Sequence, residues 1–192
     1  MTAKSDPVCS EILTINPTDP EGFVLFVRRL SELLQDLDHL FPPLIILCIG
    51  SDRSTGDALG PLVGSMLTGM KMQDVVVYGT LETPVHALNL EQTFTALRVR
   101  HGERVILAVD SSLGAKKNVG CLQLGMGSIR PGAGVHKKLP AVGDFFITGI
   151  VNVGGFMEFL VLQSTRLGVV LPLARFISSG IMQALFRSGF RQ

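Results

Sequence analysis

Two aspartates, Asp57 and Asp110, stand at positions from which they could carry out acid–base chemistry together. Asp57 closes the glycine-rich segment GSDRSTGD (50–57), which follows the apolar run Leu44–Ile49. Asp110 closes a second apolar run, RVILAVD (104–110). Two carboxyl groups in one crevice can share a proton and activate water, or they can hold a divalent cation. Either chemistry requires a fold that brings both residues to the same crevice.

Each aspartate also has a purely structural interpretation. Asp57 precedes a predicted helix, where a carboxylate can cap the first turn and interact favourably with the helix dipole. Asp110 precedes Ser-Ser-Leu-Gly (111–114), where an aspartate can hydrogen-bond the backbone of a turn. The residues alone leave both interpretations open.

The segment GSDRSTGDALGP (50–61) runs from a predicted strand into a predicted helix, a context that suits phosphate binding. Its sequence argues against that function. A Walker loop requires GxxxxGK[ST], whereas five residues separate Gly50 from Gly56 and Asp57 stands at the lysine position. The pattern GxGxxG is missing as well, and so is the GxSxG motif of serine hydrolases. We therefore expect neither a nucleotide cofactor nor a serine triad.

A glycine- and proline-rich segment, Ser128–Val142, predicts a long loop, and loops of this length inside a compact domain usually have a function. His136 is its only histidine and could approach the crevice as a metal ligand or a base. The other histidines are placed near the ends of predicted helices (His39 and His101) or in a loop (His86).

Strands that alternate with helices predict the frame for these residues. Strands are expected at 44–49, 74–79, 104–110, 119–124 and 145–151, and helices from residue 19 to Pro42 and at 58–70, 89–100, 155–166 and 169–186. Such alternation implies right-handed crossovers and a parallel core sheet. We expect a three-layer α/β/α sandwich with a mostly parallel central sheet, in which 119–124 is antiparallel or at an edge. Residues 1–18 would be a flexible lead-in, and residues 19–192 a single α/β domain.

Composition excludes several classes of protein. Hydrophobic residues make up 46% and charged residues 17%, which argues against disorder. The net charge of +1 and the lack of a basic stripe argue against nucleic-acid binding. The longest charge-free runs, Ala58–Met70 and Phe145–Met157, are shorter than the ~20 apolar residues of a membrane span. Three widely spaced cysteines resemble no disulfide framework. These features favour a cytoplasmic protein without membrane or nucleic-acid partners.

Four segments together resemble the YyaC-type sporulation proteins. They are GSDRSTGDALGPLVG (50–64), VDSSLG (109–114), PGAGVHKKLPAVGD (131–144) and ITGIVNVGGFMEFLVLQSTRL (147–167). That family is related to the spore germination protease, an endopeptidase that degrades small acid-soluble spore proteins. More distantly, the layout is similar to that of hydrogenase maturation proteases. The resemblance implies the α/β/α fold that all these families share.

The resemblance also implies an endopeptidase of sporulation or germination, which acts on small spore proteins or other sporulation proteins inside the sporulating cell or spore. The proposed catalytic aspartates of the germination protease match Asp57 and Asp110. Hydrogenase maturation proteases use the corresponding acids and a histidine to grip nickel, which implies a divalent metal site at Asp57, Asp110 and His136.

Substrate contacts are expected from backbone N–H groups of Gly50, Gly132 and Gly134 and from the side chain of Asn152, which could equally be a turn residue. The chain is much shorter than the germination protease and lacks its propeptide. A non-catalytic peptide- or protein-binding regulatory module on the same fold therefore remains the alternative, with the oligomeric state open.

Overall fold

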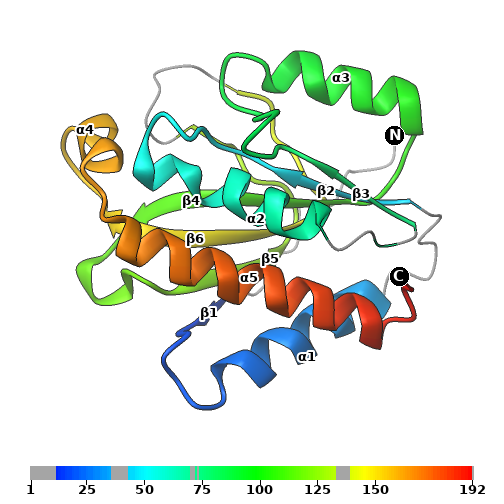
Figure 1. Cartoon of the computed structure of the whole chain (residues 1–192), viewed down its shortest axis with the longest axis horizontal. Coiled ribbons are helices and arrows are strands. Elements are labelled where there is room, and N and C mark those ends of the chain that lie inside the picture. Colours follow the sequence, from blue (N-terminus) through cyan, green and yellow to red (C-terminus); the bar gives the residue numbers. More distant parts are fainter. Residues whose placement is uncertain (1–11, 36–42, 70–71, 73, 133–138, 192) are drawn as a thin grey trace, which may run out of the picture.

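The computed structural model of the chain describes residues 12–35, 43–69, 72, 74–132 and 139–191. A six-stranded sheet forms its centre, and helices lie on both faces of the sheet (Figure 1). The strands are β1 (Leu13–Ile15), β2 (Leu44–Cys48), β3 (Val75–Tyr78), β4 (Ile106–Gly114), β5 (Leu122–Met126) and β6 (Phe145–Val153). The helices are α1 (Gly22–Gln35), α2 (Leu59–Thr68), α3 (Leu90–His101), α4 (Glu158–Gln163) and α5 (Leu167–Arg187), with short 3-10 helices η1 (Thr55–Ala58) and η2 (Lys116–Asn118).

The core of the sheet is parallel. Its spatial order is β1-β5-β6-β4-β2-β3, and β3, β2, β4 and β6 run in the same direction. Only β5 runs against its neighbours β6 and β1. The expected mostly parallel sheet is thus confirmed, and the carboxyl ends of β2 and β4 meet at one edge, where open α/β sheets place their sites.

The two faces of the sheet differ in how they are covered. Alternate residues of β2 and β4 pack on one side against the apolar faces of α1, α2 and α5, which form the larger hydrophobic core. The other residues of these strands pack against α3 and against Leu139 and Val142 of the segment before β6. Figure 1 shows α3 on the side opposite to α1 and α5. The molecule is therefore the expected three-layer α/β/α sandwich, in which the layer that contains α3 is the thinner one.

Helix α5 is long and apolar enough, by length and composition alone, to cross a membrane. Half of its most apolar stretch is buried inside the protein, and it packs against α1 and α2. Its buried residues, such as Leu173, Ile177 and Ile181, belong to the larger core. This burial is that of a core helix in a globular domain.

Two elements differ from the sequence-based expectation. Residues 13–15, which fall in the predicted lead-in, form β1 and pair with β5. Strand β4 continues to Gly114, so the segment Ser111–Gly114, expected as a turn, is extended and pairs with β6. Asp110 consequently lies within a strand instead of at its end, because β6 supplies partners for the polar residues that follow it.

Helix α2 approaches the end of β2 very closely, which fixes the segment that carries Asp57. A Cβ atom on Gly60, in the first turn of α2, would overlap with the backbone carbonyl of Ile49. Only glycine allows this contact, so the helix and the strand end are held in one geometry.

We expect Gly60→Ala to destabilise the protein by about 2–3 kcal/mol, because the added methyl group must push α2 away from β2. Gly168→Ala is the matched control, since nothing lies within 4 Å of a Cβ at this helical position. The control should be neutral or stabilising by up to about 1 kcal/mol. Urea unfolding of both variants measures the difference, and equal stabilities would contradict the close-packing account.

Candidate active site

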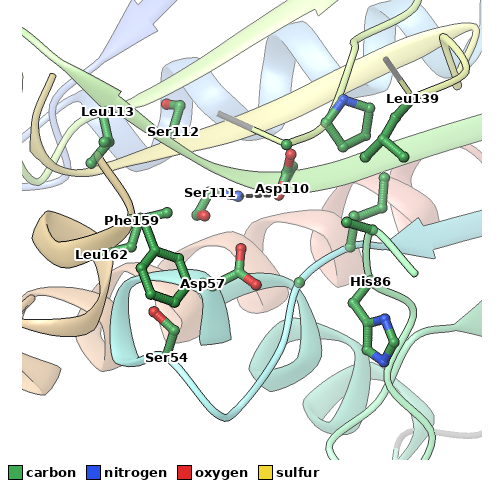
Figure 2. A pocket seen from close by; sticks show the side chains of 15 residues that line it. Ser54, Asp57, His86, Asp110, Ser111, Ser112, Leu113, Leu139, Phe159 and Leu162 are labelled. Atoms are coloured by element: carbon green, nitrogen blue, oxygen red, sulfur yellow. Dashed lines mark hydrogen bonds between the residues drawn. The ribbon is translucent and has the colours of Figure 1, made fainter. Parts of the chain in front are cut away.

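A cavity of about 90 Å³ opens at the carboxyl edge of β2 and β4, enough for several water molecules. Its walls come from the loop after β2, η1, β4, the loop after β3 and α4, and from Pro131, Gly132 and Leu139. Figure 2 shows the carboxyl groups of Asp57 and Asp110 pointing into this space. The fold thus brings together the two acids that the sequence singled out.

Asp57 is delivered by a compact turn between β2 and α2. The N–H of Ser51 donates to the carbonyl of Asp57 (3.0 Å), and the N–H of Asp57 donates to the carbonyl of Ser54 (3.0 Å). Gly50 closes the turn with φ of 139°, and a Cβ there would overlap with the Asp57 carbonyl. Within the described residues, no side chain caps α2, whose N-cap is Ala58. Asp57 therefore does not cap α2 through its side chain, although it lies just before the helix N-terminus.

Asp110 comes from β4 and is 7% exposed. In a strand, alternate side chains share a face, so Asp110 lies on the same side as Ile106 and Ala108, towards α3. Its Oδ1 accepts a hydrogen bond from the N–H of Ser111 (2.8 Å). Asp110 thus makes the expected hydrogen bond with the backbone. The bond lies within strand β4 at the wall of the cavity, however, and not in a turn.

Both acids hold protons more strongly than usual. Burial raises the pKa of Asp110 well above the ordinary value, the nearby Asp57 raises it further, and the Ser111 N–H offsets part of the shift. Burial also raises the pKa of Asp57, whereas a hydrogen bond with the Ser51 backbone and the electrostatic effect of His86 lower it in part. Because Asp57 raises the pKa of Asp110, the protonation of Asp110 depends on its neighbour, and Asp110 holds its proton more strongly than Asp57 does.

His86 belongs to the site, although its sequence context placed it only in a loop. An isolated bridge joins Ile49 to Val85, and the N–H of Gly50 donates to the Val85 carbonyl (2.8 Å). These contacts bring the loop after β3 to the end of β2. The Nδ1 of His86 accepts the N–H of Leu88 (3.3 Å), which leaves its Nε2 without a partner among the described residues. The sequence signal was a histidine just beyond a parallel strand that neighbours β2.

The cavity contains a buried hydroxyl group that has no partner among the described residues, and one of its sides is largely apolar. Within the described part of the chain, the buried Oγ of Ser54 makes no hydrogen bond, a state that costs about 1–3 kcal/mol unless a water or ligand pairs with it. Leu113, Phe159 and Leu162 lie together on one side of the space, and Leu139 lies with His86 on the other (Figure 2). The cavity thus combines two acids with apolar walls.

The residues expected to contact a substrate fare differently. Gly50 and Gly132 both line the cavity, but the N–H of Gly50 already donates to the Val85 carbonyl. Asn152 donates to Thr165 Oγ1 (3.0 Å) and to the Val161 carbonyl (3.4 Å), so it ties the end of β6 to the segment around α4. Gly134 and His136 lie outside the described residues.

A metal ion would find two oxygen-bearing ligands here. No group of three His, Cys, Asp or Glu side chains in the described ranges could hold a metal ion. Asp57 and Asp110 suit a hard divalent cation chemically, and a third protein ligand would have to come from elsewhere in the chain.

We expect Asp110→Asn to raise stability at neutral pH. The folded-state pKa of Asp110 is raised, so its contribution to stability is fully present below the unfolded pKa of ~3.9 and is lost as the pH rises through the folded value. An asparagine stays neutral and keeps an oxygen for the Ser111 N–H. Its melting temperature should therefore exceed that of the wild type at neutral pH, by about 2–4 °C per kcal/mol gained.

Thermal unfolding between acid and neutral pH measures this effect, with Asp52→Asn, an exposed acid in the loop that carries Asp57, as the control. Parallel pH profiles for the wild type and Asp110→Asn would contradict the burial account.

The [NiFe] hydrogenase maturation protease HycI from Thermococcus kodakarensis KOD1 aligns with 78% of this chain and 99% of its own, at 16% identity and a TM-score of 0.44. "Uncharacterized protein YyaC" of Bacillus subtilis (strain 168) is 50% identical over 139 residues, which are 72% of this chain and 68% of that protein. The family model described as "Protein of unknown function (DUF1256)" matches residues 15–180. The chain therefore belongs to the DUF1256 family and is similar to YyaC.

Proposed function

We propose that this protein is a peptidase in which Asp57 and Asp110 act as a pair on one water molecule. The observation that carries the proposal is the placement of both carboxyl groups in one cavity, with the pKa of Asp110 raised by burial and by Asp57. Pairs of titratable groups with different environments are typical of acid–base sites. The neighbouring apolar walls provide room for a side chain of a substrate.

The two acids take different roles. Asp57, partly exposed and close to His86, gives up its proton more readily and accepts a proton from the attacking water. Asp110 holds its proton and donates it to the oxygen of the peptide carbonyl. The water oxygen bonds to the carbonyl carbon and forms a neutral tetrahedral diol. Asp57 then passes its proton to the amide nitrogen, the C–N bond breaks, and a proton from the diol returns to Asp110.

The resemblance to YyaC-type sporulation proteins extends the proposal to a biological role. We infer an endopeptidase in the cytoplasm of the sporulating cell or spore, with small acid-soluble spore proteins as the first substrates to test. In a second version of this mechanism the two acids would bind a divalent metal ion that activates the water. An increase of peptide cleavage on addition of metal would reveal this version. A regulatory module would bind the same peptides without cleaving them.

Asp57→Asn and Asp110→Asn should each lower peptide cleavage by at least about 100-fold while leaving the fold intact, since an amide keeps the hydrogen bonds but cannot exchange a proton. Asp52→Asn, an exposed acid in the same loop, should keep full activity. The assay incubates each variant with small acid-soluble spore proteins and a peptide mixture, with chelator or divalent metal, and identifies new termini by mass spectrometry. Full turnover by either active-site variant would remove that acid from the mechanism, and binding without cleavage by the wild type would favour the regulatory module.

His86→Gln should move the acid limb of the pH–rate profile to higher pH. His86 lowers the pKa of Asp57, so its removal raises that pKa and less of Asp57 is ionised at a given acidic pH. His101→Gln is the control, because His101 pairs with Tyr78 (2.8 Å) away from the cavity. An unchanged acid limb in His86→Gln would show that the imidazole does not act on Asp57.

A further inference from the structure

Strand β4 extends well beyond the end of its neighbour β2. The two strands pair from Ile45 opposite Ile106 to Cys48 opposite Val109. β2 then stops, whereas β4 continues to Gly114 and stays paired with β6 on its other side. Among the described residues, no strand pairs with the β2-facing edge of Asp110–Gly114. An open strand edge thus borders the cavity of the two acids.

The ladder shows which backbone groups face this open edge. The carbonyls of Val105 and Val109 accept hydrogen bonds from Ile45 (3.0 Å) and Ile49 (2.7 Å), so odd-numbered residues of β4 face β2. Even-numbered residues face the side of β6, as the bonds from Asp144 to Ile106 (2.8 Å) and from Gly154 to Gly114 (2.9 Å) show. This alternation turns the carbonyl of Ser111 and the N–H of Leu113 towards the open edge. One residue of an added parallel strand can bond both groups.

An apolar wall stands beside these groups. Leu113 lines the cavity together with Phe159 and Leu162 of α4 (Figure 2). Phe159 is 53% exposed, and Phe156, which precedes α4, is 90% exposed. Of the two, Phe159 lines the cavity, and exposed aromatic groups of this kind are typical of surfaces that an apolar ligand covers. A side chain on a bound peptide could fill the space between them and β4.

We propose that an extended peptide segment with an apolar side chain binds as an added strand along Ser111–Leu113, against Phe159, and so presents its backbone carbonyl to Asp57 and Asp110. The inference rests on the proposed function, because it names the substrate class of the same site. Main-chain bonds supply affinity in this mode, and the side-chain pocket supplies selectivity. The strand edge leads directly into the cavity of the two acids. An extended peptide can follow this path, which favours it as the occupant over the surface of a folded protein.

The test uses a protein that cannot turn the peptide over. Isotope-labelled Asp57→Asn protein is titrated with the blocked peptide Ac-Ala-Ala-Leu-Ala-Ala-NH2 and followed by NMR. We expect the amide signals of Ser111–Leu113 and Phe159 to shift at millimolar peptide. A series of peptides, each methylated at one backbone nitrogen, identifies the peptide N–H that donates to the Ser111 carbonyl. Methylation of that nitrogen should weaken binding about fivefold, the effect of one lost hydrogen bond. Leucine replaced by alanine should weaken binding too.

A second variant pair keeps the side-chain part of the inference falsifiable. In the same background, Phe159→Ala should remove the preference for the leucine peptide over the alanine peptide. Phe186→Ala, which removes an exposed ring from the end of α5, should leave the preference intact. Shifts away from β4 and α4, no shift at all, or equal affinity of every methylated peptide would overturn the inference. Binding at this edge without cleavage by the wild-type protein would support the inference and reject the proposed peptidase function.

Discussion

The burial of one carboxyl group next to a second is the physical constraint on which this site depends. An ionised carboxylate is costly to remove from water, so Asp110, which is 7% exposed, lowers that cost by keeping its proton. Asp57 in the same cavity raises the pKa of Asp110 further. The fold maintains this unfavourable pairing because neither residue is free to move away. Asp110 sits in a strand that is paired with β6 at this point, and Asp57 is held in a closed turn.

That turn depends on close backbone approaches more than on side-chain packing. Gly50 has a positive φ and lies against the Asp57 carbonyl, and Gly60 lies against the end of β2. The bridge between Ile49 and Val85 adds the loop that carries His86. The turn, the start of α2 and the more distant loop that carries His86 thus converge on the end of one short strand. The early end of β2 has two consequences, because it makes room for the cavity and leaves the edge of β4 open.

Much of this arrangement could be predicted from the sequence. The apolar runs 44–49 and 104–110 predicted two parallel strands, which the structure places side by side. The residues that closed the glycine segment and the second run predicted the two acids. The polar Ser-Ser-Leu-Gly segment after Asp110 suggested a turn, but β6 offers it a complete ladder, so it continues as strand. His86 was missed because its proximity depends on a long-range bridge that no local pattern encodes. Asn152 was expected to contact a substrate or to form a turn, whereas it lies within β6 and hydrogen-bonds Val161 and Thr165.

The central claim is that Asp57 and Asp110 titrate as a coupled pair, and a carboxyl-carbon NMR titration of selectively labelled protein tests it most directly. The account predicts that Asp110 titrates well above the usual aspartate pKa of ~3.9, and that Asp57→Asn moves its pKa back down because a negative neighbour is removed. Two aspartates that titrate independently, with Asp110 in the ordinary range and unaffected by Asp57→Asn, would contradict the account.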